Sequence, residues 1–275
     1  MKGVPHTTVG FIDRASVQVG GGLRAIGYIM AALILSMPLM TDTQRLSRRL
    51  IELIGCSRRE AELYIEGGWV TVDGEVVDTP QFTVHDQQVA LAPDAKAEAP
   101  EPVTLILNQP TGLDDAGALA ALAPHTQATA FDTGKRVLKG HFRRLKCLAP
   151  LQAGASGLQV FSQDWRTARK LTTEFAKLEQ EYLVEVRGAL KTGALEQLKR
   201  GMEHKGVALP AAKCSWQNET HLRIALKAPA PGVVAQLCMA VGLEPVSMRR
   251  LRVGAVSMGK LPVGQWRYLT VQERF

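Results

Sequence analysis

The stretch from Arg45 to Val77, RLSRRLIELIGCSRREAELYIEGGWVTVDGEVV, decides the fold of the first part of the chain. Its opening residues alternate apolar and charged side chains at the spacing of an amphipathic helix, which we expect to end at Gly55. Arginine and glutamate side chains occupy the other sides of this helix. The residues predicted to form its buried face are Leu46, Leu50, Leu53 and Ile54.

A second helix and a tight hairpin follow directly. Ser57 and Glu60 have the spacing of a capping box, which predicts a helix that starts here, runs to Ile65 and ends at the glycine pair 67–68. Beyond it, valines flank Asp73-Gly74, a pair suited to a two-residue type I′ turn. The sequence therefore predicts helix, helix and β-hairpin in this order.

Two arginines stand where the helix dipole disfavours them. Arg58 and Arg59 fall in the first turn of the second helix, where a cation opposes the positive end of the dipole. An anionic ligand would explain this placement. Solvation of a helix face by charged side chains is the other interpretation, and the local pattern alone leaves both open.

The order of these pieces resembles the small S4-type RNA-binding domain of ribosomal proteins and rRNA-modifying enzymes. The resemblance covers residues from about Gln44 to Leu91 and rests on RLSRRL, GCSRREA and IEGG-V-TVDGEVV. It implies RNA as a partner. The residues that it places on the RNA face are Arg45, Arg48, Arg49, Ser57, Arg58 and Arg59.

Composition agrees with an acidic partner. The chain has 275 residues, of which 46% are hydrophobic, enough for a full core and for two domains. Its net charge of +7 and pI near 9.4 favour nucleic acid over a membrane. The four cysteines form no CxxC pair, so neither a zinc site nor a disulfide framework is indicated. We expect a reducing compartment, the cytoplasm.

The first forty residues have a different character. Ala25 to Met40 is an apolar run behind two arginines, short for a membrane span and closer in length to the core of a signal peptide. No small-residue cleavage site precedes Thr41. We therefore expect residues 1–40 to be a non-native extension created by an early start assignment, with Met40 as the natural start. A true export or membrane signal is the alternative.

The remaining chain divides into an S4-type domain at residues 41–91, a linker at 92–102 and a second domain at 103–275. The linker, APDAKAEAPEP, is too rich in alanine, proline and charge to build a core. The second domain mixes predicted strands and helices, which indicates an α+β fold with a mixed, mostly antiparallel sheet and flanking helices. The expected strands are 103–108, 157–162, 182–186 and 222–226, and the expected helices are 167–178 and 232–241.

Four segments of the second domain resemble motifs of the small-subunit and dual-specificity RNA pseudouridine synthases, in the same order. LILNQPTGL starts at Leu105, LAPLQAGASGLQVFSQD at Leu148 and EQEYLVEVRGAL at Glu179. The last, VSMRRLRVGAVSMGKLPVGQWRYLTVQE, starts at Val246. The resemblance implies a monomeric enzyme that converts uridine to pseudouridine in ribosomal or transfer RNA without a cofactor or metal.

That chemistry needs a carboxylate. In the family an aspartate of a GRLD tetrad attacks a flipped-out uridine, an arginine two residues earlier pairs with it, and a tyrosine stacks on the base. Here the tetrad reads Ala-Pro-Leu-Gln, so Gln152 takes the nucleophile position and Pro150 the arginine position, while Tyr182 is kept. An amide is uncharged and weakly nucleophilic. The sequence therefore predicts a catalytically inactive member.

Other departures agree. Two lysine positions of the family are Gln109 and Gln180, and an arginine-rich helix corresponds to the uncharged segment Pro231–Leu237. Arg250 and Arg252 survive and are expected to bind RNA. By the resemblance, Asp164 corresponds to a different aspartate of the family, at the far end of the strand. The other acidic side chains nearby are expected to be helix caps or loop residues without a catalytic role: Asp114, Asp115 and Asp132.

A basic stretch precedes the altered tetrad. It is either a solvated loop or, as we expect beside an S4-type domain, a contact for phosphates. Trp69, Trp165 and Trp216 are expected in the core rather than stacked on bases. Two function classes stay open, a non-catalytic RNA-binding protein and an active synthase with altered residues. The basic residues predicted to bind RNA are Lys135, Arg136, Lys139, Arg143, Arg144 and Lys146, with His141 among them.

Overall fold

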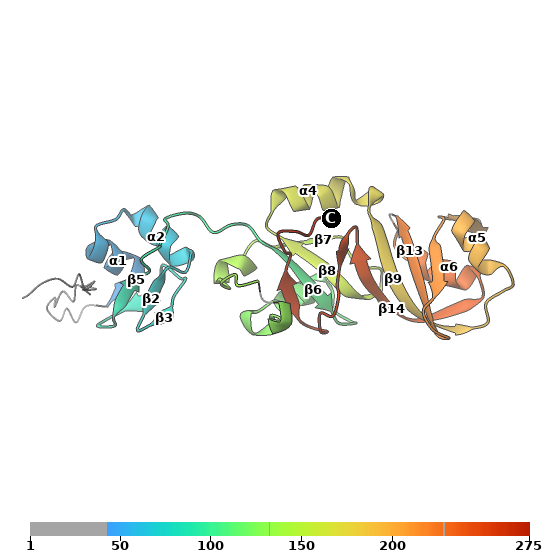
Figure 1. Cartoon of the computed structure of the whole chain (residues 1–275), viewed down its shortest axis with the longest axis horizontal. Helices are drawn as coiled ribbons and strands as arrows, with labels where there is room; N and C mark the ends of the chain where they lie inside the picture. The colour runs from blue at the N-terminus through green and yellow to red at the C-terminus, as the bar shows by residue number, and fades with distance from the viewer. Residues whose placement is uncertain (1–42, 132, 228) are drawn as a thin grey trace, which may run out of the picture. The chain divides into compact units, whose positions relative to one another are not determined.

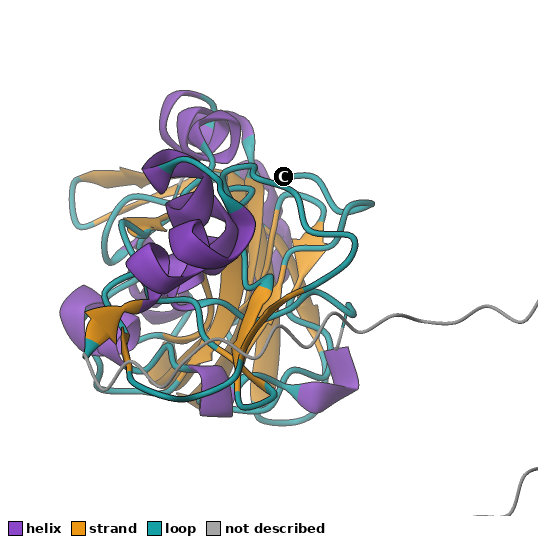
Figure 2. Ribbon diagram, turned by 90° about the vertical axis from the view of Figure 1, so that its left-hand side faces the viewer, coloured by secondary structure: helices purple, strands orange, loops and turns teal. Residues whose placement is uncertain are grey.

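The computed structural model describes residues 43–131, 133–227 and 229–275. The apolar run that ends at Met40 lies outside the described residues. Among the described helices, none combines the length and the apolar character that crossing a membrane requires. Helices and strands occur in the chain both before and after the segment 92–102. Figure 2 shows the described helices, strands and loops in separate colours.

The first helical pair forms as predicted. Helix α1 (Leu46–Ile54) is followed by Gly55 in the left-handed conformation, and the Gly55 N–H donates to the Ile51 carbonyl. Helix α2 (Arg58–Glu66) begins with the complete capping box, in which Ser57 Oγ accepts from the Glu60 N–H and Glu60 accepts from the Ser57 N–H. Both helix ends therefore satisfy main-chain groups that would otherwise lack partners.

The hairpin is also as predicted. Asp73 and Gly74 have φ angles of 50° and 85°, the two positive values that a type I′ turn requires. They join β2 (Val70–Val72) to β3 (Glu75–Val76). Strand β5 (Val89–Leu91) pairs with the other edge of β2, and β1 (Gln44–Arg45) pairs with β4 (Thr83–Val84).

One face assignment is wrong. Leu46 and Leu50 are buried with apolar residues of α2 and β2, but Leu53 and Ile54 are 41% and 43% exposed. Ile51 packs against this core instead. Helix α1 has nine residues, and its last turn extends beyond the small core of this domain. The apolar side chains of that turn therefore have no buried surface to pack against.

The second domain is built on a large sheet, whose strands β6, β8, β9, β13 and β14 are labelled in Figure 1. The strand order along it is β12-β13-β9-β14-β8-β6-β16, with β15 and β7 attached at the side. Among the described strand pairs of this sheet, β14 and β8 run parallel and the others antiparallel, which confirms the mixed, mostly antiparallel sheet. The strands are β6 (Thr104–Gln109), β7 (Lys146–Leu148), β8 (Ser156–Ser162), β9 (Glu179–Gly188), β12 (Lys213–Trp216), β13 (His221–Lys227), β14 (Leu243–Val253), β15 (Val256–Ser257) and β16 (Trp266–Tyr268).

The helices of this domain are short. The predicted helix 167–178 is instead α4 (Trp165–Thr173) followed by a 3₁₀ turn, and it starts earlier because the Asp164 carboxylate accepts from the N–H groups of residues 166 and 167. A separate hairpin joins β10 and β11. The other elements are α3 (Asp115–Ala120), α5 (Ala194–Arg200), α6 (Val233–Ala240), β10 (Met202–His204), β11 (Val207–Leu209), η1 (Pro124–Thr126), η2 (Thr129–Phe131), η3 (Lys139–Phe142) and η4 (Phe175–Lys177).

The parallel pair in the centre of the sheet brings distant residues together. Arg250 of β14 lies beside Gly157 of β8 on one side and beside Tyr182 of β9 on the other. Gly157 has a φ of 100°, and a Cβ atom there would lie 2.3 Å from the Arg250 carbonyl oxygen. Only glycine therefore permits this close approach of β8 and β14.

Candidate functional site

Gln152, at the predicted nucleophile position, lies in the loop between β7 and β8 and is 6% exposed. Its Nε2 donates to the Pro229 carbonyl at 3.2 Å, and its Oε1 accepts from the Gly232 N–H at 2.7 Å. Both ends of the amide are thus bonded to the main chain just before α6. The side chain ties two loops together and offers no nucleophile.

Tyr182 lies at the centre of the domain. Its side chain is fully buried in the cluster formed by β9, β13 and α6, and its hydroxyl donates to Gln180 Oε1 at 2.8 Å. Burial raises the pKa of Tyr182, and hydrogen-bonding groups of Arg250 and Gln152 reduce that rise. In this conformation the ring has no exposed face on which a base could stack.

Arg250 is the third buried member of this site, with an exposed fraction of 0%. Its Nε donates to the Leu158 carbonyl, and its two terminal nitrogens donate to the carbonyls of Ala149 and Pro150. The side-chain oxygens of Gln180 and Gln159 complete the set at 3.1 Å each. Every one of these acceptors is neutral, and within the described part of the chain no carboxylate forms an ion pair with Arg250.

This arrangement has a clear electrostatic consequence. Burial lowers the pKa of Arg250, since the protein removes water that would stabilise the charge. Five oxygen dipoles replace that water. The prediction that Arg250 binds RNA has no support in its position, because no part of the side chain reaches the surface.

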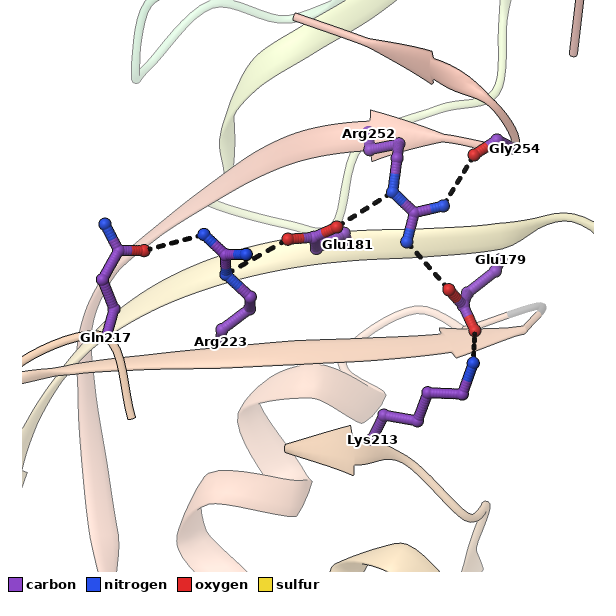
Figure 3. A network of polar contacts seen from close by, with 7 residues as sticks. All are labelled: Glu179, Glu181, Lys213, Gln217, Arg223, Arg252 and Gly254. Atoms are coloured by element: carbon purple, nitrogen blue, oxygen red, sulfur yellow. Dashed lines mark hydrogen bonds and ion pairs between the residues drawn. The ribbon is translucent and has the colours of Figure 1, made fainter. Parts of the chain in front are cut away.

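Arg252 has partners of its own, in the network drawn in Figure 3. Its guanidinium forms ion pairs with Glu179 at 2.8 Å and Glu181 at 2.9 Å and donates to the Gly254 carbonyl. Lys213 and Arg223 pair with the same two glutamates. The glutamates alternate along β9 with the buried residues 180 and 182, so this network occupies the opposite face of the sheet.

The acidic side chains have separate positions. Asp114 caps α3 by accepting from the Gly117 N–H, as expected, and Asp164 caps α4. Asp115 is exposed in the first turn of α3, yet its charge raises the pKa of Cys147 further, beyond the larger effect of burial, to about 12. The same charge stabilises the protonated form of Arg250. Asp132 lies outside the described residues.

Two further buried glutamines belong to this part of the domain: the sequence analysis names Gln109 but not Gln159. Gln109 is buried, and its Nε2 donates to the Leu113 carbonyl, which fixes the turn before α3. Gln159 is fully buried and bonds Leu148, Cys147 and Arg250. Its signal in the sequence is a polar side chain inside an otherwise apolar strand, SGLQVFS.

The basic stretch before the tetrad lies mostly at the surface. His141 is the exception: it is buried, contacts the Tyr268 hydroxyl at 2.7 Å, and burial together with Lys135 lowers its pKa to about 4. It is therefore neutral at pH 7 and adds nothing to the cationic surface. The exposed members are Lys135, Arg136, Lys139, Arg143, Arg144 and Lys146.

The arginines of the first domain gather beside α1. Arg45, Arg48 and Arg58 line a pocket of about 470 Å³ that opens at the surface. Glu52 and Glu62 form exposed ion pairs with Arg48 and Arg58 at 3.2 and 3.0 Å, and pairs this exposed contribute little. Arg59 is exposed and Arg49 is half-buried. The Ser57 hydroxyl accepts a hydrogen bond from the Glu60 N–H in the capping box.

Residues 44–89 match the S4 domain family. An "Uncharacterized RNA pseudouridine synthase" of Aquifex aeolicus is 28% identical, over 83% of this chain and 94% of its own. The "Dual-specificity RNA pseudouridine synthase RluF" of Salmonella typhi is 25% identical, over 86% of this chain and 79% of its own length. The "Ribosomal small subunit pseudouridine synthase A" of Vibrio cholerae is 24% identical, over 83% of this chain and 97% of its own length.

A crystal structure of pseudouridylate synthase superposes with a TM-score of 0.51 at 18% identity, covering 82% of this chain and 96% of that one. At this identity the likeness concerns the fold. The α+β prediction, with an S4 domain ahead of a pseudouridine synthase fold, is confirmed. The chain is a homologue of the S4-domain-containing RNA pseudouridine synthases, the small-subunit and dual-specificity types among them.

Proposed function

We propose that this chain is a non-catalytic RNA-binding protein on a pseudouridine synthase scaffold. The observation that carries the proposal is the state of Gln152, whose amide is buried and bonded at both ends to main-chain groups. Attack on the sugar of a uridine needs an anionic carboxylate that can approach the flipped nucleotide. Here the corresponding side chain is neutral, and Tyr182 is enclosed in the core.

The proposed partner is RNA, with ribosomal RNA favoured over transfer RNA. The S4 domain, the net charge of +7 and the names of relatives that act on the ribosomal small subunit support this choice. Arg250 and Arg252 are left out, because Arg250 is fully buried and Arg252 is partly buried between two carboxylates. The proposed RNA contacts are Arg45, Arg48, Arg49, Ser57, Arg58, Arg59, Lys135, Arg136, Lys139, Arg143, Arg144 and Lys146.

The test of inactivity compares purified protein with a relative that has an intact GRLD tetrad. Both are incubated with total ribosomal and transfer RNA, and pseudouridine is mapped chemically. We expect modification only by the relative. Stoichiometric pseudouridine made by this chain and lost in Tyr182→Phe would overturn the proposal.

An active synthase with altered residues is the second candidate, and one observation favours it. Asp115 is an exposed carboxylate whose charge raises the pKa of both Cys147 and Arg250, and Arg250 belongs to the buried site. If the chain forms pseudouridine, Asp115→Asn should abolish it, whereas Asp114→Asn keeps a side-chain oxygen that caps α3 and should leave the chemistry in place. Equal pseudouridine yields from both variants would exclude this carboxylate.

Binding, location and assembly have their own tests. In a fourfold arginine variant, Arg48, Arg49, Arg58 and Arg59 are replaced by alanine. Its affinity should fall similarly for all RNA sequences, because phosphate contacts carry no sequence information.

We also propose a cytoplasmic monomer, on the basis of the unpaired cysteines and the family. Cell fractionation and light scattering of the purified protein check these two points.

A further inference from the structure

A groove of about 760 Å³ lies between the start of α4, the end of β16 and the last residues of the chain. It is separate from the Gln152 site and shares no lining residue with it. Its volume falls in the range of pockets that hold small ligands, roughly 300–1,000 Å³. The charged residues that line it are Lys135, Asp164, Arg166, Lys170, Glu273 and Arg274.

The groove is cationic in effect. Four basic side chains stand against two side-chain carboxylates and the main-chain carboxylate of Phe275, and the two side-chain carboxylates already have partners. Asp164 caps α4, and Glu273 accepts from both terminal nitrogens of the buried Arg267 at 2.7 Å. Lys135 pairs with Glu101 at 3.6 Å, but that carboxylate is 87% exposed and the pair is weak. Among the described residues, Arg166, Lys170 and Arg274 form no ion pair, so an anion in this groove meets positive charge at these three side chains.

An exposed tryptophan stands beside this groove. Trp165 is the first residue of α4 and is 63% exposed, so the prediction that it belongs to the core is wrong. The neighbouring Arg166, which lines the groove, places its guanidinium 5.6 Å from the centre of the indole ring. An aromatic face next to cations is the combination that stacks unpaired bases while holding their phosphates.

We propose that the groove and Trp165 bind a segment of single-stranded RNA. Phosphates lie against Arg166, Lys170 and Arg274, and a base stacks on Trp165. A duplex is disfavoured, because its bases are already stacked on one another. This inference rests on the proposed RNA-binding function and adds a second contact, remote from the S4 domain in the sequence and independent of its arginines.

The test measures binding of the full chain to a fluorescein-labelled 12-nucleotide uridine oligomer by anisotropy. Trp165→Ala should weaken binding about 5- to 150-fold, the effect of losing one stacked base. Trp165→Phe should recover most of the affinity. The double variant Arg166→Ala/Lys170→Ala should reduce the slope of log K against log salt by about 1.4, or about 0.7 for each lost phosphate contact.

Matched controls use residues that do not line the groove. Trp216 is also exposed, at 37%, and Trp216→Ala should bind as the wild type. Lys199→Ala/Arg200→Ala removes two charges from α5 and should leave the salt slope unchanged. Thermal melting of each variant shows that the fold is kept.

Three outcomes would overturn the proposal in distinguishable ways. Groove variants that bind normally, beside a fourfold arginine variant that binds weakly, reject the groove and keep the proposed function. A wild-type chain that binds no RNA rejects both. Uridine monophosphate that displaces the oligomer at an equal dissociation constant identifies a mononucleotide site in place of a strand site.

Discussion

Replacing Arg250 by methionine tests whether this side chain holds the domain together or contacts RNA. Methionine is similar in length and adaptable in shape, but it donates no hydrogen bond. Three main-chain carbonyls and two glutamine side chains then lose a donor inside the protein. Each buried acceptor without a partner costs about 1–3 kcal/mol. The desolvation of the guanidinium, which disappears with it, offsets part of that sum.

We expect Arg250→Met to lower the free energy of unfolding by about 3–5 kcal/mol, as removal of one partner from a buried charged cluster does. For a domain of about 150–250 residues this corresponds to a melting temperature lower by about 6–20 °C. The assay is urea unfolding followed by tryptophan fluorescence, to which the fully buried Trp266 contributes. RNA affinity, measured below the melting temperature, should not change.

Arg252→Met is the matched control. It removes the same group from the partly exposed network in Figure 3, where we expect a loss of about 1 kcal/mol. The reasoning would be refuted by a stability loss below about 1 kcal/mol in Arg250→Met together with weaker RNA binding. A salt slope reduced by about one would then identify Arg250 as a phosphate contact.

Three further results are expected. Gln152→Asp should form no pseudouridine in the chemical mapping assay, because the Pro150 position and the segment Pro231–Leu237 still lack the family's arginines; any product would contradict this. The fourfold arginine variant should show a flatter salt dependence of RNA binding, and an unchanged slope would show that the S4 domain makes no phosphate contacts. The pKa of His141 is lowered to about 4, below its value in the unfolded chain, so stability should rise with pH between about 4 and 6.5 and be fully present above that window. His141→Gln should flatten the curve, as urea unfolding at several pH values would show, and an unaltered curve would exclude His141 as its source.

The local structure of the S4 domain follows from signals that act within a few residues. The capping box at Ser57, the left-handed Gly55 and the Asp73-Gly74 turn all depend on neighbours in the sequence, and all three form as predicted. The exposure of Leu53 could not be read in this way. It depends on how far the small core extends, which is a property of the packed domain.

The candidate site was predictable in its residues but not in its state. The sequence shows that a glutamine stands where the chemistry needs a carboxylate. It does not show that Tyr182 and Arg250 are buried, because their burial follows from the pairing of β9, β14 and β8. In that pairing Arg250 lies beside Tyr182, 68 residues away in the sequence, and beside Gly157, 93 residues away. Likewise, nothing local distinguishes Trp165, at the surface of α4, from a core tryptophan.

The neutral side chains of this site depend on one another. A buried arginine without compensation is strongly destabilising, and no carboxylate among the described residues pairs with Arg250, so neutral oxygen atoms must stabilise its charge. Gln180, Gln159 and the carbonyls before and at Pro150 supply them. Gln152 in turn needs both a donor and an acceptor, since it bonds the Pro229 carbonyl and the Gly232 N–H, and a carboxylate would serve only the second. An aspartate at position 152 would lose the hydrogen bond to the Pro229 carbonyl, which joins the Gln152 loop to the segment before α6. A return to catalysis would therefore need several coordinated changes.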